Sequence, residues 1–139
     1  MAAIGTRLLK MTIGANNVEA QISKAIVTSG EASSDFVTFA EAAAGGAREY
    51  KLALTAVQDP AANTIWSTVF DSAGSSVACL YKPFGNATAT PTQPHFSFNA
   101  IVSEPDGDLL GSEADASATA RALIEVEWTL TGKPTKITA

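Results

Sequence analysis

Few of the 139 residues combine types and spacing that could support catalysis. His95 is the only histidine and Cys79 the only cysteine, so the chain has no pair of imidazole or thiol groups at zinc-site spacing. No serine lies in a Gly-x-Ser-x-Gly sequence, and a Ser-His-Asp triad would depend entirely on His95. We therefore expect His95 at the surface or at a strand edge, Cys79 as a small core residue, and no enzymatic activity.

Two further stretches resemble ligand-binding motifs only in part. Gly132 and Lys133 have the order found in a phosphate-binding loop, but Pro134 follows where Ser or Thr is required, so we expect a turn. An acidic run offers the carboxylate oxygens that calcium prefers, in an order unlike that of an EF-hand loop. It consists of Glu104, Asp106, Asp108, Glu113 and Asp115. A solvated loop is the expectation, with weak calcium binding as the alternative, and no cofactor is expected.

The overall charge bears on the class of partner. The net charge is −5 and the isoelectric point is about 4.7, which provides no basic footprint for gripping a nucleic acid. An acidic surface can instead let a polyanion slide past without sticking. Only 17% of the residues are charged, and a lightly charged exterior suits a protein that is partly buried against other subunits.

Length and hydropathy predict one domain, residues 1–139. The first residues lack the apolar stretch of a secretory signal, and no apolar run is long enough to cross a membrane. We therefore expect a protein without a membrane partner that is made in the cytoplasm and either used there or assembled there into something larger.

Apolar and polar residues alternate in several stretches, as is typical of half-buried strands. The first two of these stretches flank turn-forming residues and are expected to make a hairpin. The last stretch has the most regular alternation. The predicted strands cover residues 7–13, 18–27, 48–58, 76–82, 95–104 and 118–130.

A single helix is predicted over residues 60–73. Asp59 is the expected N-cap, Pro60 suits the first helical position, and Gly74 ends the helix. Trp66 and Phe70 recur at helical spacing, so both are expected to be buried against a sheet.

The segment of residues 28–46 is long, rich in small residues and weakly patterned. It contains a short β-like stretch, DFVTFA, and a possible helical turn in AEAAAGG. A connection this long is typical of a lid or a contact loop, with an ordinary mobile hairpin as the alternative. The whole pattern predicts a mainly β (α+β) fold, a sandwich or open barrel with the helix covering one end.

The order of these features resembles the tail tube, or major tail, proteins of long-tailed bacteriophages. The resemblance runs from about residue 7 to the end of the chain and depends on five stretches in this order: DFVTFAEAAAGG, REYKLALTAVQD, TIWSTVFDSAG, YKPFGNATATPTQPHFSFNAIV and WTLTGKPTKIT. It implies a fold of two packed antiparallel sheets flanked by the helix at 60–73 and the loop at 28–46. It also implies hexameric rings that stack into a tube, assembled in the host cytoplasm and located in the virion tail. The implied partners are further copies of the chain, other tail proteins (tape measure, tail terminator and distal tail), and genomic DNA that passes through an acidic lumen without tight binding.

The resemblance also implies which segments meet neighbouring copies: the loop at 28–46 and the tail at 132–139. The basic tail would meet acidic surface on an adjacent copy. The candidate inter-subunit residues are Glu31, Asp35, Phe36, Phe39, Glu41, Lys133 and Lys136. Glu125 and Glu127, on the polar face of the last strand, are candidates for the lumen, although that face could equally point outside the tube.

Two other functions fit the same residues. One is a capsid decoration protein or a head–tail connector component, which would form trimers or a cap instead of stacked tubes. The other is a free-standing β-sandwich binding module, whose recognition surface would be the loops at 28–46 and 83–94. Those loops offer few aromatic residues beyond Phe36, Phe39 and Phe84.

Overall fold

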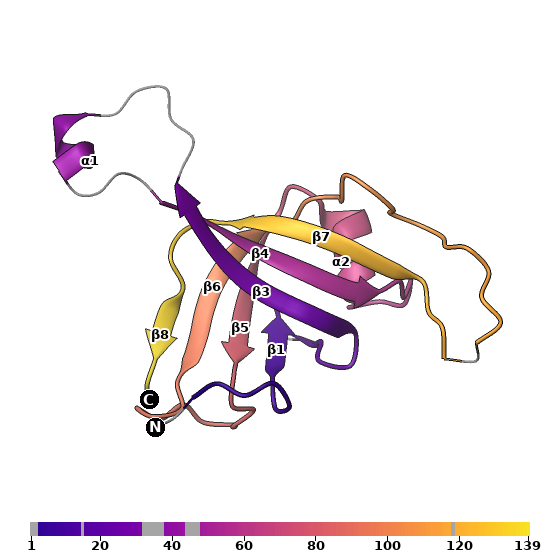
Figure 1. Ribbon diagram of the computed structural model, residues 1–139, viewed down its shortest axis with the longest axis horizontal. Helices are drawn as coiled ribbons and strands as arrows, with labels where there is room; N and C mark the ends of the chain where they lie inside the picture. The colour runs from indigo at the N-terminus through magenta and orange to yellow at the C-terminus, as the bar shows by residue number, and fades with distance from the viewer. Residues whose placement is uncertain (1–2, 15, 32–37, 44–47, 118) are drawn as a thin grey trace.

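The computed structural model describes residues 3–14, 16–31, 38–43, 48–117 and 119–139 (Figure 1). Its strands are β1 (Lys10–Ile13), β2 (Asn16–Asn17), β3 (Ile22–Glu31), β4 (Arg48–Val57), β5 (Ser76–Lys82), β6 (His95–Ile101), β7 (Leu123–Leu130) and β8 (Thr135–Ile137). The helices are α1 (Phe39–Ala43) and α2 (Ile65–Ser72). All of these strands belong to one antiparallel sheet in the order β2-β1-β5-β6-β7-β4-β3, and β8 pairs with β6 beside this path. The predicted mainly β fold is therefore confirmed.

The sheet bends sharply between β6 and β7. These strands share only a short ladder, in which Ala100 pairs with Leu130 and Ile101 with Thr129. Beyond it, β3, β4 and β7 lie across β1, β5 and β6 (Figure 1). One open, bent sheet thus takes the place of the two separate sheets that the sequence predicted. The core lies between its halves and includes Met11, Ile13, Leu52, Leu54, Cys79, Phe98, Ala100, Val126 and Trp128.

Alternation identifies the buried face of the central strands correctly. In β7 the residues Ile124, Val126, Trp128 and Leu130 are buried, and every intervening side chain is exposed. The strand begins at Leu123, although alternation predicted a start at residue 118, because its partner β4 ends at Val57, opposite Leu123.

The predicted hairpin between residues 7–13 and 18–27 is wrong. The short β1 pairs with β2 and β5, whereas β3 pairs with β4 over its whole length. Residues 19–21 form a turn that separates β2 from β3, and Gln21 in this turn accepts a hydrogen bond through its backbone oxygen from Val57 N at 2.8 Å. This contact aligns the start of β3 with the end of β4.

Helix α2 begins later than predicted, and Asp59 is not its N-cap. The Asp59 carboxylate instead accepts from Ala61 N at 3.0 Å in a local turn. Asn63 has a φ of 63°, a left-handed conformation that no helix interior contains. Thr64 is the N-cap, and its hydroxyl oxygen accepts from Ser67 N at 3.2 Å.

The apolar face of α2 packs on the core only in part. Ile65, Trp66 and Val69 are buried, as expected, but Phe70 is 51% exposed. Its ring stacks on Trp66 with centroids 5.0 Å apart. The prediction that Phe70 is buried against a sheet is therefore wrong, because the helix is short and Phe70 lies at the rim of its buried stripe.

Segment 28–46 also differs from its prediction. Its first residues, Thr28–Glu31, continue β3 in register with β4, so the connection begins only after Glu31. The β-like stretch at residues 35–40 falls partly outside the described residues, and its last two residues begin α1, where the β prediction is wrong.

Candidate assembly surfaces

The most exposed large apolar side chain described in this chain belongs to the connection between β3 and β4. We name this connection, residues 32–47, the arm. Phe39 begins α1 within the arm and is 97% exposed. α1 lies apart from the sheet, beyond the adjoining ends of β3 and β4 (Figure 1). A phenyl ring in this position is available to another molecule.

The base of the arm is well defined. Glu31 and Arg48 are register partners at the last step of the β3–β4 ladder. Arg48 also donates through Nη2 to Ser29 Oγ at 3.3 Å. Both ends of the arm are therefore fixed side by side on the sheet.

Three of the predicted contact residues in the arm are not placed. Asp35 and Phe36 lie outside the described residues, and so does the side chain of Glu41. Their part in assembly stays a prediction.

The β3 strand lies at one end of the strand order. It pairs with β4 on one side, and none of the described strands pairs with its other side. This edge runs from Ile22 to Glu31 and is exposed over most of its length. An edge of this length presents unpaired backbone donors and acceptors to which another chain can add a strand.

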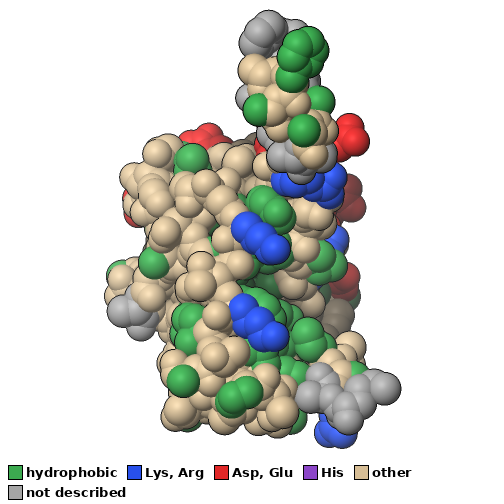
Figure 2. Space-filling view, turned by 90° about the vertical axis from the view of Figure 1, so that its left-hand side faces the viewer, with side chains coloured by type: hydrophobic (Ala, Val, Ile, Leu, Met, Phe, Trp, Pro, Cys, Tyr) green, Lys and Arg blue, Asp and Glu red, His purple; other side chains and the backbone are tan. Residues whose placement is uncertain are grey.

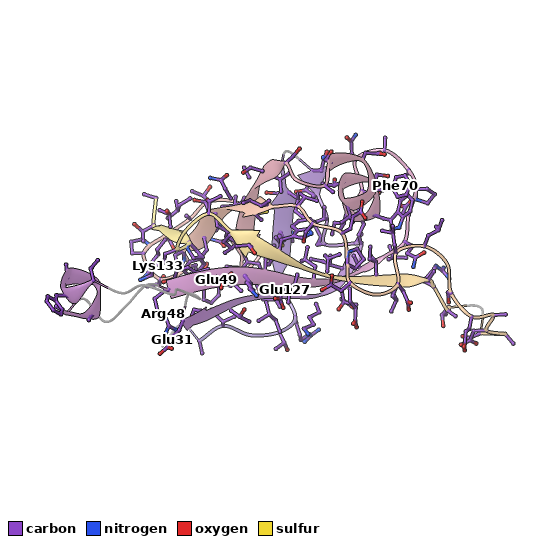
Figure 3. All side chains as sticks on the ribbon, turned by 90° about the horizontal axis from the view of Figure 1, so that it is seen from above. Glu31, Arg48, Glu49, Phe70, Glu127 and Lys133 are labelled. Atoms are coloured by element: carbon purple, nitrogen blue, oxygen red, sulfur yellow. The ribbon has the colours of Figure 1, made fainter. Side chains whose placement is uncertain are left out.

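The C-terminal segment adds a strand to the sheet. Thr135–Ile137 form β8 and pair with His95–Ser97 of β6. This half of β6 has an open edge because β7 pairs only with its other end. Lys133 and Lys136 are both exposed, and Figure 3 shows Lys133 at the same end of the sheet as Glu31 and Arg48.

Glu125 and Glu127 are both exposed on the outer face of β7, away from the core. Glu127 Oε1 lies 3.2 Å from Lys51 Nζ on the neighbouring strand. The hydrogen bond and the charge of Glu127, with a further contribution from Glu49, raise the pKa of Lys51 above its usual value. The two side chains are 40% and 58% exposed, so the pair contributes little to stability.

A broad groove of about 960 Å³ covers this outer face. Its walls are the polar face of β4 and β7 and the beginning of the loop between β6 and β7, and its lining includes Glu104, Asp106 and Asp108 as well as Glu125 and Glu127. Trp128 fixes the loop by donating its indole N–H to the backbone oxygen of Ser103 at 3.2 Å. The groove thus gathers acidic groups from two segments that are distant in sequence.

Two further side chains fasten the same loop, and sequence patterns gave no signal for either role. Trp66 donates its indole N–H to the backbone oxygen of Leu109 at 2.8 Å. Gln58 donates to the oxygens of Gly111 and Leu123 and accepts from Gly111 N at 2.8 Å. A buried indole and a bidentate amide can be assigned such partners only once the loop has been placed.

His95 is buried, with 5% of its surface exposed, so the expected surface position is wrong. Its Nε2 lies 3.0 Å from the backbone oxygen of Asn86. Because a carbonyl oxygen only accepts, Nε2 carries the proton. Asn86 in turn donates to the backbone oxygens of Thr88 and Gln93. His95 therefore organises the loop at 83–94, which has the irregular structure predicted for it.

Comparison with models of known protein families gives no match, and comparison with curated proteins gives none either. The surfaces described above are therefore what indicates the function of this chain.

Within the described ranges, no three His, Cys, Asp or Glu side chains are grouped so that they could hold a metal ion. None of the helices seen there has the length and apolar character needed to span a membrane. The arrangement offers an exposed aromatic arm, an unpaired strand edge and a polar, acidic outer face, which are features suited to contacts between proteins.

Proposed function

We propose that this chain is a structural protein whose copies associate into stacked rings and form the wall of a phage tail tube. The observation that carries the proposal is Phe39, a large apolar side chain that is 97% exposed on an arm apart from the sheet. Exposing a phenyl ring to water is unfavourable, and docking it against another protein recovers the cost.

Two other features support self-association. The edge of β3 can pair with a strand of a neighbouring copy, which would continue the sheet from one subunit to the next. If the arm and the strand edge each meet a different surface of a neighbouring copy, the contacts are head-to-tail, and such contacts close into rings or extend into filaments.

In this proposal Glu125 and Glu127 line the channel. Both side chains are exposed on a face that the core does not use, and the groove beside them is rich in carboxylates. Negative charge on a channel wall repels the phosphates of DNA and lets the duplex pass without binding.

Negative-stain electron microscopy of the purified chain over a concentration series tests the proposal. Tubes or stacked rings with a central channel are the expected result. A monomer at every concentration would contradict it and favour a binding module. Trimers or caps without stacking would also contradict it and favour a decoration or connector protein.

A further inference from the structure

The bent sheet leaves an apolar groove where its two halves do not meet. The groove has a volume of about 330 Å³, which is within the range of about 300–1,000 Å³ found for ligand pockets. It lies between β3 and β4 on one side and β5, β6 and the residue that precedes β8 on the other. Its lining includes Ala25, Val27, Leu52, Tyr81, Phe96 and Pro134.

Val27 shows that this groove is a gap in the core. It is the register partner of Leu52, so its side chain faces the same side of the sheet as that buried residue. Leu52 is 1% exposed, whereas Val27 is 37% exposed. The difference arises because β3 and β8 are not paired, and no described segment covers Val27 from the other side.

Helix α1 of the same chain does not fill the groove. α1 lies beyond the end of the sheet, away from the opening between β3 and β8 (Figure 1). The arm thus presents an exposed phenyl ring that its own chain does not bury, and the groove presents apolar walls that its own chain does not cover.

The charges around the two surfaces are complementary. From Glu31 to Ala47 the sequence contains Glu31, Asp35 and Glu41 and no basic residue. Two exposed basic residues are neighbours of residues that line the groove. Lys133 precedes the lining residue Pro134, and Lys136 is the register partner of the lining residue Phe96. Figure 2, which faces this side of the molecule, shows apolar side chains beside exposed basic ones below the arm.

We propose that Phe39 of one copy occupies the apolar groove of a second copy, and that the acidic sequence around Phe39 favours approach to the part of that copy that carries Lys133 and Lys136. This inference deepens the proposed function and rests on the self-association that it requires. The apolar contact supplies the affinity, and the charges set the orientation and the rate of encounter.

Cross-linking between two variants tests the contact directly. One variant carries Phe39→Cys and the other Val27→Cys, and the two are mixed and oxidised with copper–phenanthroline. The native Cys79 is buried, and burial raises its pKa to about 12, so it stays unreactive. We expect a disulfide-linked heterodimer, resolved by a tag on one variant.

Thr28→Cys is the matched control for the groove variant. Thr28 is the next residue along β3, is exposed, and pairs with Lys51 on the opposite face of the sheet. The yield of disulfide-linked heterodimer with Val27→Cys should exceed the yield with Thr28→Cys by about tenfold, because only position 27 faces the groove. Equal yields, or no heterodimer with either variant, would overturn the inference.

Sedimentation velocity with Phe39→Ala supplies a second readout. Loss of the ring should weaken self-association by about tenfold or more. Leu110→Ala, which removes a side chain that is 72% exposed on a different loop, should leave it unchanged. Tubes that persist with Phe39→Ala and show no specific cross-link would refute the groove contact alone. A specific cross-link without tubes would refute the tube proposal and support the groove contact.

Discussion

Trp66 and Phe70 stack on one another yet contribute differently to stability. Trp66 is buried and hydrogen-bonded to Leu109, whereas half of Phe70 is exposed. Trp66→Ala should lower the free energy of unfolding by about 3–5 kcal/mol because it leaves a cavity and an unpaired carbonyl. Phe70→Ala should cost about 1 kcal/mol, mainly through the lost ring pair. Urea denaturation measures both, and equal losses would contradict this packing of α2.

Cys79 makes stability depend on pH in the alkaline range. Burial raises the pKa of its thiol from 9.0 to about 12. Between these values the unfolded chain loses the proton that the folded chain keeps, so the contribution is complete below about pH 9 and is lost as pH rises towards 12. Between about pH 8.5 and 10.5 this group should lower the free energy of unfolding by about 2 kcal/mol.

Urea denaturation of the wild type and of Cys79→Ala at both pH values checks this expectation. Burial also raises the pKa of Tyr81, so the variant should keep some alkaline loss. The decline with pH should nevertheless be smaller in the variant by the amount due to the thiol. The same decline in both proteins would show that Cys79 is accessible to solvent.

At the scale of elements, the arm can be removed without disturbing the sheet. Glu31 and Arg48 are register partners, so a two-residue Asn-Gly turn can replace residues 32–47 and close β3 and β4 as a hairpin. This variant should keep the wild-type free energy of unfolding within about 1 kcal/mol, since the entropy of loop closure depends only weakly on loop length. It should fail to assemble in electron micrographs.

A second variant separates loop length from side-chain contact. It keeps the length of the arm and replaces residues 38–43 with glycine and serine. We expect it to fold and, like the hairpin variant, to remain unassembled. Normal tubes from either variant would exclude the arm as the assembling element.

Sequence pattern identifies the strands better than it identifies their partners. The alternation in β4 and β7 identifies their buried faces because one face of each strand packs on the core and the other faces solvent. The pairing of β3 with β4 across the arm is a long-range choice that no local pattern contains. β8 likewise forms only because β6 has an open edge beside it, and that edge exists only in the folded sheet.

Sequence likewise identifies single candidate residues for assembly but not the surfaces that they form together. The sequence marks Phe39 as an aromatic residue in an unusual connection, and the structure leaves it exposed. Nothing in the sequence indicates that Val27 and Pro134 share an apolar groove, because that groove requires β3 and β8 to face one another across the open side of the sheet.

At the scale of the whole molecule, the acidic outer face should keep assembled particles from binding DNA. Glu125→Lys combined with Glu127→Lys changes this face while keeping the fold, because both side chains are exposed. Assembled wild type should leave labelled duplex DNA in the supernatant after centrifugation. The double variant should retain the DNA, and retention should fall steeply with salt as counterions compete for the phosphates.

Net charge alone must be separated from position on the molecule. Glu113→Lys combined with Asp115→Lys is the matched control, since each reversal adds two charges and both double variants therefore change the net charge from −5 to −1. These two residues lie on the exposed loop between β6 and β7, outside the groove that contains Glu125 and Glu127. If only the β7 variant retains DNA, the β7 face lines the channel. Equal retention by both variants would mean that DNA binding follows overall charge. It would contradict the placement of Glu125 and Glu127 on the channel wall.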